Sequence, residues 1–165
     1  MSYRPIEDRI RWASECEGGV LVAAWVTRRH LVILLPRLAE WLDQQSPLQR
    51  QTVAPEAAKQ EIRSFEHQAA QQRIKAVRGK TRVRQPDVEF LLNYFGVRVI
   101  GEGLVELHLV APGEELRVSL PGTVAQLHKL IRELLEIGNA AGWGVADPWR
   151  SVEPSPRAAA AKTRH

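Results

Sequence analysis

The residue types that most often carry chemistry occur in this chain without the spacing that the chemistry requires. Gly79-Lys80-Thr81 has the form of the end of a phosphate-binding loop, but the glycine required five positions before Gly79 is replaced by Ile74. Such a loop also follows a strand and opens a helix. Here a predicted helix precedes it and a predicted strand follows it, so we reject a nucleotide-phosphate site at this position.

The histidines and the single cysteine predict neither a metal site nor a catalytic one. No two of the five histidines have the spacing of three or four residues that places two ligands on one helix face. They are His30, His67, His108, His128 and His165. One cysteine, Cys16, excludes an internal disulfide and a cysteine-based zinc site. We expect no catalytic residues, no metal and no cofactor.

The positive charge of the chain is concentrated in the segment 73–84. The whole chain carries a net charge of +4. The segment has six basic residues and no acidic one: Arg73, Lys75, Arg78, Lys80, Arg82 and Arg84. The tail 150–165 is also basic, so the rest of the chain is net negative. A basic segment of this kind can follow a phosphate backbone, but it has no aromatic residue on which a base could stack. A solvated helix end and loop would have the same composition.

The first half of the chain predicts two strands followed by two helices. Residues 5–14 and 19–27 alternate or are Val-rich, and we expect them to form a hairpin. Thr27 is a suitable N-cap for a helix whose apolar stripe begins at Leu31. Pro36 should kink this helix or mark its true start. A second helix should begin near Pro55-Glu56. Its expected stripe is Ala58, Ile62, Phe65, Ala69 and Val77.

The segment 88–120 predicts an antiparallel meander of three strands. Turns at Gly101-Glu102-Gly103 and at Pro112-Gly113 divide it. The first turn pairs Val99 with Val105, Arg98 with Glu106, and Val97 with Leu107. A two-residue second turn pairs Leu109 with Leu116, His108 with Arg117, and Leu107 with Val118. The alternation then leaves one apolar face and one polar face, the latter holding Glu106, His108 and Ser119.

A last helix and a tail complete the organisation. Thr123 and Gln126 have the spacing of a capping box, and Gly142 or Gly144 should end the helix. The predicted order is ββ-αα-βββ-α, in which an antiparallel sheet packs against helices in an α+β fold. We expect a single domain over residues 1–149 and a disordered basic tail over residues 150–165.

Several large apolar residues exceed what a small single-sheet domain is expected to bury. Such a surplus is typical of a surface that binds another protein, although a helix covering both faces of the sheet would also account for it. The candidates for a partner surface are Val32, Ile33, Leu91, Phe95, Trp143 and Trp149.

These observations favour a non-enzymatic accessory or adaptor protein that acts through protein–protein binding or self-association. One alternative is a nucleic-acid-binding accessory factor that uses the basic segment 73–84, and another is a small enzyme without a recognisable motif. The apolar runs are too short to span a membrane, and we expect a reducing cytoplasm. The size and the missing chemistry fit the small accessory proteins of bacterial or phage operons.

Overall fold

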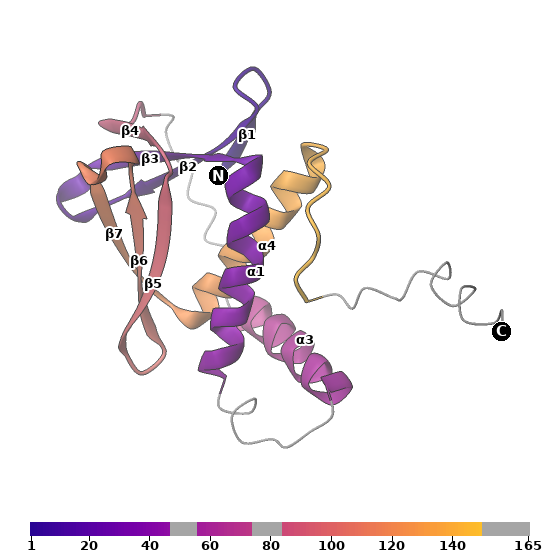
Figure 1. The fold of residues 1–165 in the computed structure, drawn as a ribbon. Coiled ribbons are helices and arrows are strands. Elements are labelled where there is room, and N and C mark those ends of the chain that lie inside the picture. Colours follow the sequence, from indigo (N-terminus) through magenta and orange to yellow (C-terminus); the bar gives the residue numbers. More distant parts are fainter. Residues whose placement is uncertain (47–55, 74–83, 150–165) are drawn as a thin grey trace.

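Two small sheets and three helices enclose one apolar core in the computed structural model, which describes residues 1–46, 56–73 and 84–149 (Figure 1). The helices are α1 (Arg28–Gln45), α3 (Glu56–Arg73) and α4 (Val124–Ala140). The strands are β1 (Ser2–Arg4), β2 (Arg9–Glu15), β3 (Leu21–Thr27), β4 (Val88–Leu91), β5 (Tyr94–Gly101), β6 (Leu104–Val110) and β7 (Arg117–Thr123). The α+β class and the predicted order of elements are confirmed, with the short strand β1 added at the N-terminus and the first strand of the predicted meander divided into β4 and β5. Within the described ranges, no helix combines the length and apolar character that crossing a bilayer requires.

The first sheet has the order β1-β2-β3-β4, and its last strand runs parallel to β3. The segment 88–99, expected to be the first strand of the meander, is therefore divided between two sheets. Leu92 N–H donates to the Trp25 carbonyl of the first sheet, and Asn93 N–H donates to the Val110 carbonyl of the second. The chain thus passes from one sheet to the other between residues 92 and 93.

The second sheet is an antiparallel meander of β5, β6 and β7. The predicted pairing of Arg98 with Glu106 and of Val97 with Leu107 is confirmed. The predicted pairing of β6 with β7 is wrong by two residues, because Leu107 lies opposite Leu120 and His108 lies opposite Ser119.

The cause of this error is the turn between β6 and β7. It is longer than two residues, since Pro112–Glu114 form a 3-10 turn that Ala111 N–H closes by donating to the Leu116 carbonyl. A shift by two residues leaves every side chain on its predicted face. The apolar face is therefore correct although its cross-strand partners are not.

Helices α1 and α4 cover the apolar faces and contact each other closely. Thr27 caps α1 by accepting from His30 N–H, and α1 continues through Pro36 without ending. Thr123 and Gln126 form the predicted capping box of α4. A Cβ at Gly138 would lie 2.7 Å from Leu31 Cδ2, so glycine is required for the two helices to approach this closely.

Helix α3 begins at Glu56, as expected. The prediction that Phe65 belongs to its buried apolar stripe is wrong. The side chain of Phe65 is 69% exposed. Polar contacts tie α3 to the end of α1 instead, since Ser46 Oγ donates to Glu66 at 2.6 Å and Arg63 pairs with Asp43 at 2.8 Å. Pro55 and Val77 lie outside the described residues.

The segment after α4 folds back onto the body of the protein. Trp143 is buried, and its indole N–H donates to Asp8 Oδ1 at 2.8 Å. This hydrogen bond, with another from the Tyr3 hydroxyl, lowers the pKa of the Asp8 carboxyl. Trp149 is also buried and stacks on His67. The chain thus covers both tryptophans itself.

Candidate functional site

A groove of about 310 Å³ lies between helix α1 and strand β5. One wall is a single face of α1, because the residues that line it follow one another by three, one, three, one and three positions. These residues are His30, Ile33, Leu34, Arg37, Leu38 and Trp41. The other wall is formed by residues 92–97, at the start of β5. We call this surface the α1–β5 groove.

The α1–β5 groove has a buried apolar floor and a partly exposed apolar rim. Leu34 and Leu38 are buried and form part of the core. Ile33 is 46% exposed and Tyr94 is 58% exposed, on opposite walls. Trp41 is half-buried between floor and rim. A surface of this kind, concave and apolar with an aromatic rim, is typical of a binding site.

Aside from tyrosine and tryptophan, the polar side chains described in the lining of the α1–β5 groove are one arginine, one histidine and one asparagine. Arg37 is exposed on the α1 wall. His30 lies about two helical turns before Arg37 on the same face, with its Nδ1 3.0 Å from Thr27 Oγ1. Asn93 adds an uncharged amide on the other wall, and no Asp or Glu is among the described lining residues. The groove therefore favours a ligand with negative charge.

Tyr94 and Gly96 shape the β5 wall. Both side-chain positions are on the same face of the strand, and a Cβ at Gly96 would lie 3.1 Å from the Tyr94 ring. The absence of a side chain at Gly96 lets the tyrosine ring lie over the strand. The same β5 residues also line a second hollow of about 390 Å³ on the polar face of the sheet, together with His108, Glu114 and Arg117.

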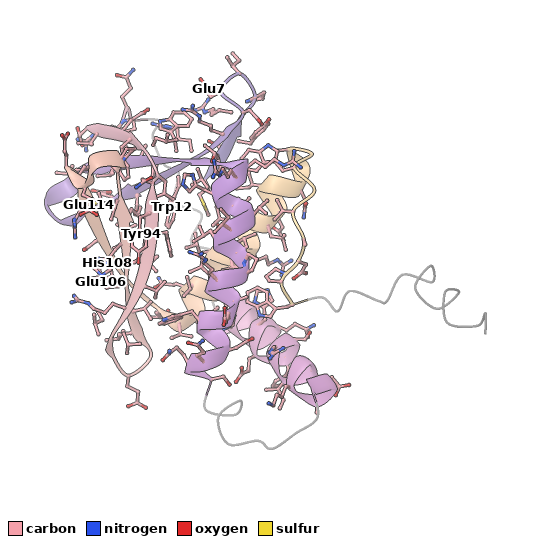
Figure 2. All side chains as sticks on the ribbon, viewed as in Figure 1. Glu7, Trp12, Tyr94, Glu106, His108 and Glu114 are labelled. Carbon is pink, nitrogen blue, oxygen red and sulfur yellow. The ribbon has the colours of Figure 1, made fainter. Side chains whose placement is uncertain are left out.

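The polar face of the second sheet carries a hydrogen-bonded row of three side chains. His108 Nδ1 lies 3.1 Å from Ser119 Oγ, and His108 Nε2 lies 3.1 Å from Glu106 Oε2. Figure 2 labels His108 and Glu106 next to each other on this sheet. His108 thus contacts one side chain of its own strand and one of β7. Arg117 does not contact His108 and pairs with Glu114 instead, because of the two-residue shift in register.

Ser119, His108 and Glu106 are the residue types of a nucleophile, a base and an acid, but their surroundings differ from those of a catalytic site. Glu106 also accepts from Arg98 at 2.7 Å, so its charge is already balanced. The three side chains lie on an open sheet face, whereas stabilisation of a charged intermediate requires a site from which water is excluded. Cross-strand and next-but-one neighbours on one sheet face meet in this way without any catalytic role.

Two histidines that were not predicted to meet form a pair between α3 and α4, in which His128 is buried and His67 is partly buried. Nδ1 of His67 on α3 lies 3.2 Å from Nδ1 of His128 on α4. Burial lowers the pKa of both imidazoles, to about 4 for His128. Trp149 stacks against His67 with ring centroids 4.0 Å apart. No described group of three or more His, Cys, Asp or Glu side chains has an arrangement that could hold a metal ion.

The predicted partner-surface residues have different environments. Ile33 and Phe95 line the α1–β5 groove, and Val32 is exposed on another side of α1. Leu91 is half-buried in β4. Trp143 and Trp149 are buried within the chain, so they have to be removed from the set.

The basic segment 73–84 is described only at its two ends. Arg84 is exposed, pairs with Asp87 at 3.0 Å and donates to the Gly19 carbonyl at 3.2 Å. Arg73 is the last residue of α3. Lys75, Arg78, Lys80 and Arg82 lie outside the described residues, so their role stays a prediction.

Sequence reasoning missed Trp41, Arg37 and Tyr94 as residues of one surface. The regular spacing of the α1 residues was readable as one helix face. The opposing wall was not, because its position depends on the passage of the chain from the first sheet to the second at residues 92–93.

Comparison of the chain with protein-family models, curated proteins and solved structures finds no match.

Proposed function

We propose that this protein is a non-enzymatic accessory protein that binds another protein through the α1–β5 groove. The observation that carries this proposal is the meeting of exposed apolar side chains from two separate elements, Ile33 and Tyr94, on one concave surface. Isolated exposed apolar residues are common on any protein, whereas a contiguous concave group favours a binding role.

Two neighbouring residues of α1 provide a matched test. Ile33 is 46% exposed and lines the groove, while Val32 is 49% exposed and does not. Both substitutions to glutamate should fold, since neither side chain is buried. The tagged full chain and the two variants, Ile33→Glu and Val32→Glu, would be used to capture proteins from a lysate of the native cells, with quantification by mass spectrometry.

We expect a partner that is retained by the wild type and by Val32→Glu and is lost with Ile33→Glu. Equal retention by both variants would show that the groove is not the binding surface. Capture of nothing above the level of a tag-only control would contradict the proposal as a whole.

A second exposed apolar group favours self-association as an alternative. Val99, Ile100 and Leu104 are all about half exposed at the tip of the β5–β6 hairpin. Light scattering at micromolar concentration tests this alternative directly. A dimer that becomes a monomer with Leu104→Glu, but not with Ile33→Glu, would assign the self-contact to the hairpin and leave the groove for a partner.

A further inference from the structure

Strand β5 lies at an edge of its sheet, where it pairs with β6. Strand β6 also pairs with β7, and the hydrogen bonds between β6 and β7 show which backbone groups of β6 are left to face β5. Ala111 N–H donates to the Leu116 carbonyl, and Pro121, which has no N–H, lies opposite Glu106. Hydrogen-bonded and non-hydrogen-bonded pairs alternate along an antiparallel ladder. Glu106 and every second residue of β6 therefore direct their N–H and C=O groups away from β7 and towards β5.

The alternate backbone groups of β5 consequently face the α1–β5 groove. Glu106 pairs with Arg98, and His108 pairs with Gly96, across the inner ladder. Gly96 and Arg98 therefore direct their N–H and C=O groups towards β6. Phe95 and Val97 alternate with these residues along β5, so their N–H and C=O groups point to the open edge. Both residues line the groove. Within the described part of the chain no strand or backbone partner meets this edge. An edge of this kind accepts an added strand.

The α1 wall and the β5 wall of the groove have about the same length, and this length suits a short extended segment. From His30 to Trp41 the α1 wall extends about 16 Å, at about 1.5 Å per residue. An extended chain covers the same distance with about five residues, at about 3.3 Å each. A segment added to β5 would direct alternate side chains to the α1 wall, where Ile33 and Trp41 offer apolar contact. This is the arrangement of peptides that bind between a sheet edge and a helix.

Charge distinguishes between the possible occupants. Arg37 on the α1 wall, with no acidic side chain among the described residues of the lining, is complementary to an acidic segment. The basic segments of this chain, 73–84 and 150–165, have the wrong charge. A second copy that paired its own β5 edge would bring two basic α1 walls together. An acidic segment of another protein fits best.

We infer that the α1–β5 groove binds a short, extended, acidic segment of a partner protein as an added strand on the edge of β5. The segment places alternate apolar side chains against Ile33 and Trp41 and a carboxylate against Arg37. This inference rests on the proposed function, because it specifies the partner of the same groove.

The inference can be tested on the full chain with synthetic peptides. The probe is a library of seven-residue peptides in which valine or isoleucine alternates with threonine and one position holds glutamate, matched by a library with lysine at that position. Binding is measured by fluorescence polarisation. We expect the best glutamate peptide to bind at least tenfold more tightly than its lysine counterpart. Arg37→Glu should reverse this preference, and Arg29→Glu, an exposed arginine of α1 outside the groove, should leave it unchanged.

Strand addition has its own readout. The best peptide would be prepared with N-methyl groups on one alternate set of its amides, and then on the other set. Only one set faces β5, so one form should lose at least tenfold in affinity and the other should bind as the parent does. Equal binding of both methylated forms would overturn strand addition. Equal binding of the glutamate and lysine libraries would overturn the acidic segment.

Failure of this inference is distinguishable from failure of the proposed function. If no peptide binds but the native partner is still lost with Ile33→Glu and kept with Val32→Glu, the groove binds a partner in another form. If light scattering shows a dimer that Arg37→Glu disrupts, the occupant is a second copy and the inference is wrong.

Discussion

Nδ1 of His67 lies 3.2 Å from Nδ1 of His128, so one imidazole must donate the hydrogen of this contact and the other must accept it. The accepting ring must therefore be neutral in the folded protein. Removal from water disfavours the charged form of each. For His67, Asp147 partly offsets this effect and Arg132 adds to it. For His128 the neighbouring His67 adds to it.

The histidine pair predicts that the protein loses stability as the pH falls below 6.5. The pKa of each imidazole is lower in the folded chain than in the unfolded one, so the unfolded chain binds more protons between pH 6.5 and about 4. The free energy of unfolding should decrease across this window, by up to about 3 kcal/mol for His128. Urea melts at several pH values would measure it. The decrease should be smaller with His128→Gln, and an identical pH profile for the wild type and this variant would refute the assignment.

The register of the second sheet predicts an order of stability among its leucines. Leu109 is 2% exposed, whereas Leu107 is only half-buried, although both belong to the apolar face. Leu109→Ala should lower the free energy of unfolding by about 2–5 kcal/mol. Leu107→Ala should cost less, because its side chain loses less contact with the core. Denaturant melts of the two variants decide the order, and a larger loss at Leu107 would contradict the deeper burial of Leu109.

The row Ser119–His108–Glu106 predicts a structural role without turnover. The full chain should not hydrolyse a simple activated ester such as p-nitrophenyl acetate faster than free imidazole at the same concentration. Ser119→Ala removes one hydrogen bond on an open face, so it should change the free energy of unfolding by about 1 kcal/mol or less. Ester hydrolysis that both Ser119→Ala and His108→Gln abolish would instead support the small-enzyme alternative.

The basic segment 73–84 predicts steeply salt-dependent binding if it contacts nucleic acid. Six neutralised phosphates correspond to a slope of up to about −5 for the logarithm of affinity against the logarithm of salt on duplex DNA. Neutralising Arg78, Lys80, Arg82 and Arg84 together should flatten the slope by about four-sixths. Fluorescence anisotropy at two salt concentrations measures it.

Two controls are needed for that experiment. Arg84 also pairs with Asp87 and donates to the Gly19 carbonyl, so Arg84→Gln alone separates a loss of structure from a loss of phosphate contact. Deletion of residues 151–165 removes the competing basic tail. Absence of binding to duplex DNA, single-stranded DNA and RNA at about 50 mM salt would eliminate this alternative.

Local signals along the sequence predicted the elements of this fold well. The caps at Thr27 and Thr123 depend on neighbouring residues only, and both were predicted. The β5–β6 register was predicted because a short glycine-rich turn determines it. The β6–β7 register was not predicted, because the positive φ of Gly113 and Glu114 permits a longer turn. The dipeptide Pro112-Gly113 does not by itself indicate this turn.

The candidate site was predicted only in part, because it depends on contacts between distant segments. Ile33 stood out as an apolar residue off the main stripe of its helix. Its opposing wall required β4 to leave the meander and join the first sheet, which no local pattern indicates. The burial of Trp143 was unpredictable for the same reason, since its hydrogen-bond acceptor, Asp8, lies at the other end of the chain.

The parallel pairing of β4 with β3 has a consequence for synthesis. Strand β3 is complete at Thr27, but its second neighbour arrives only after both α1 and α3 have been made. At about 5–20 residues per second, a ribosome takes several seconds to reach Val88. During that time the nascent β2–β3 hairpin presents an open edge next to apolar side chains such as Val22 and Val26, and an unpaired edge of this kind can pair with another chain and aggregate.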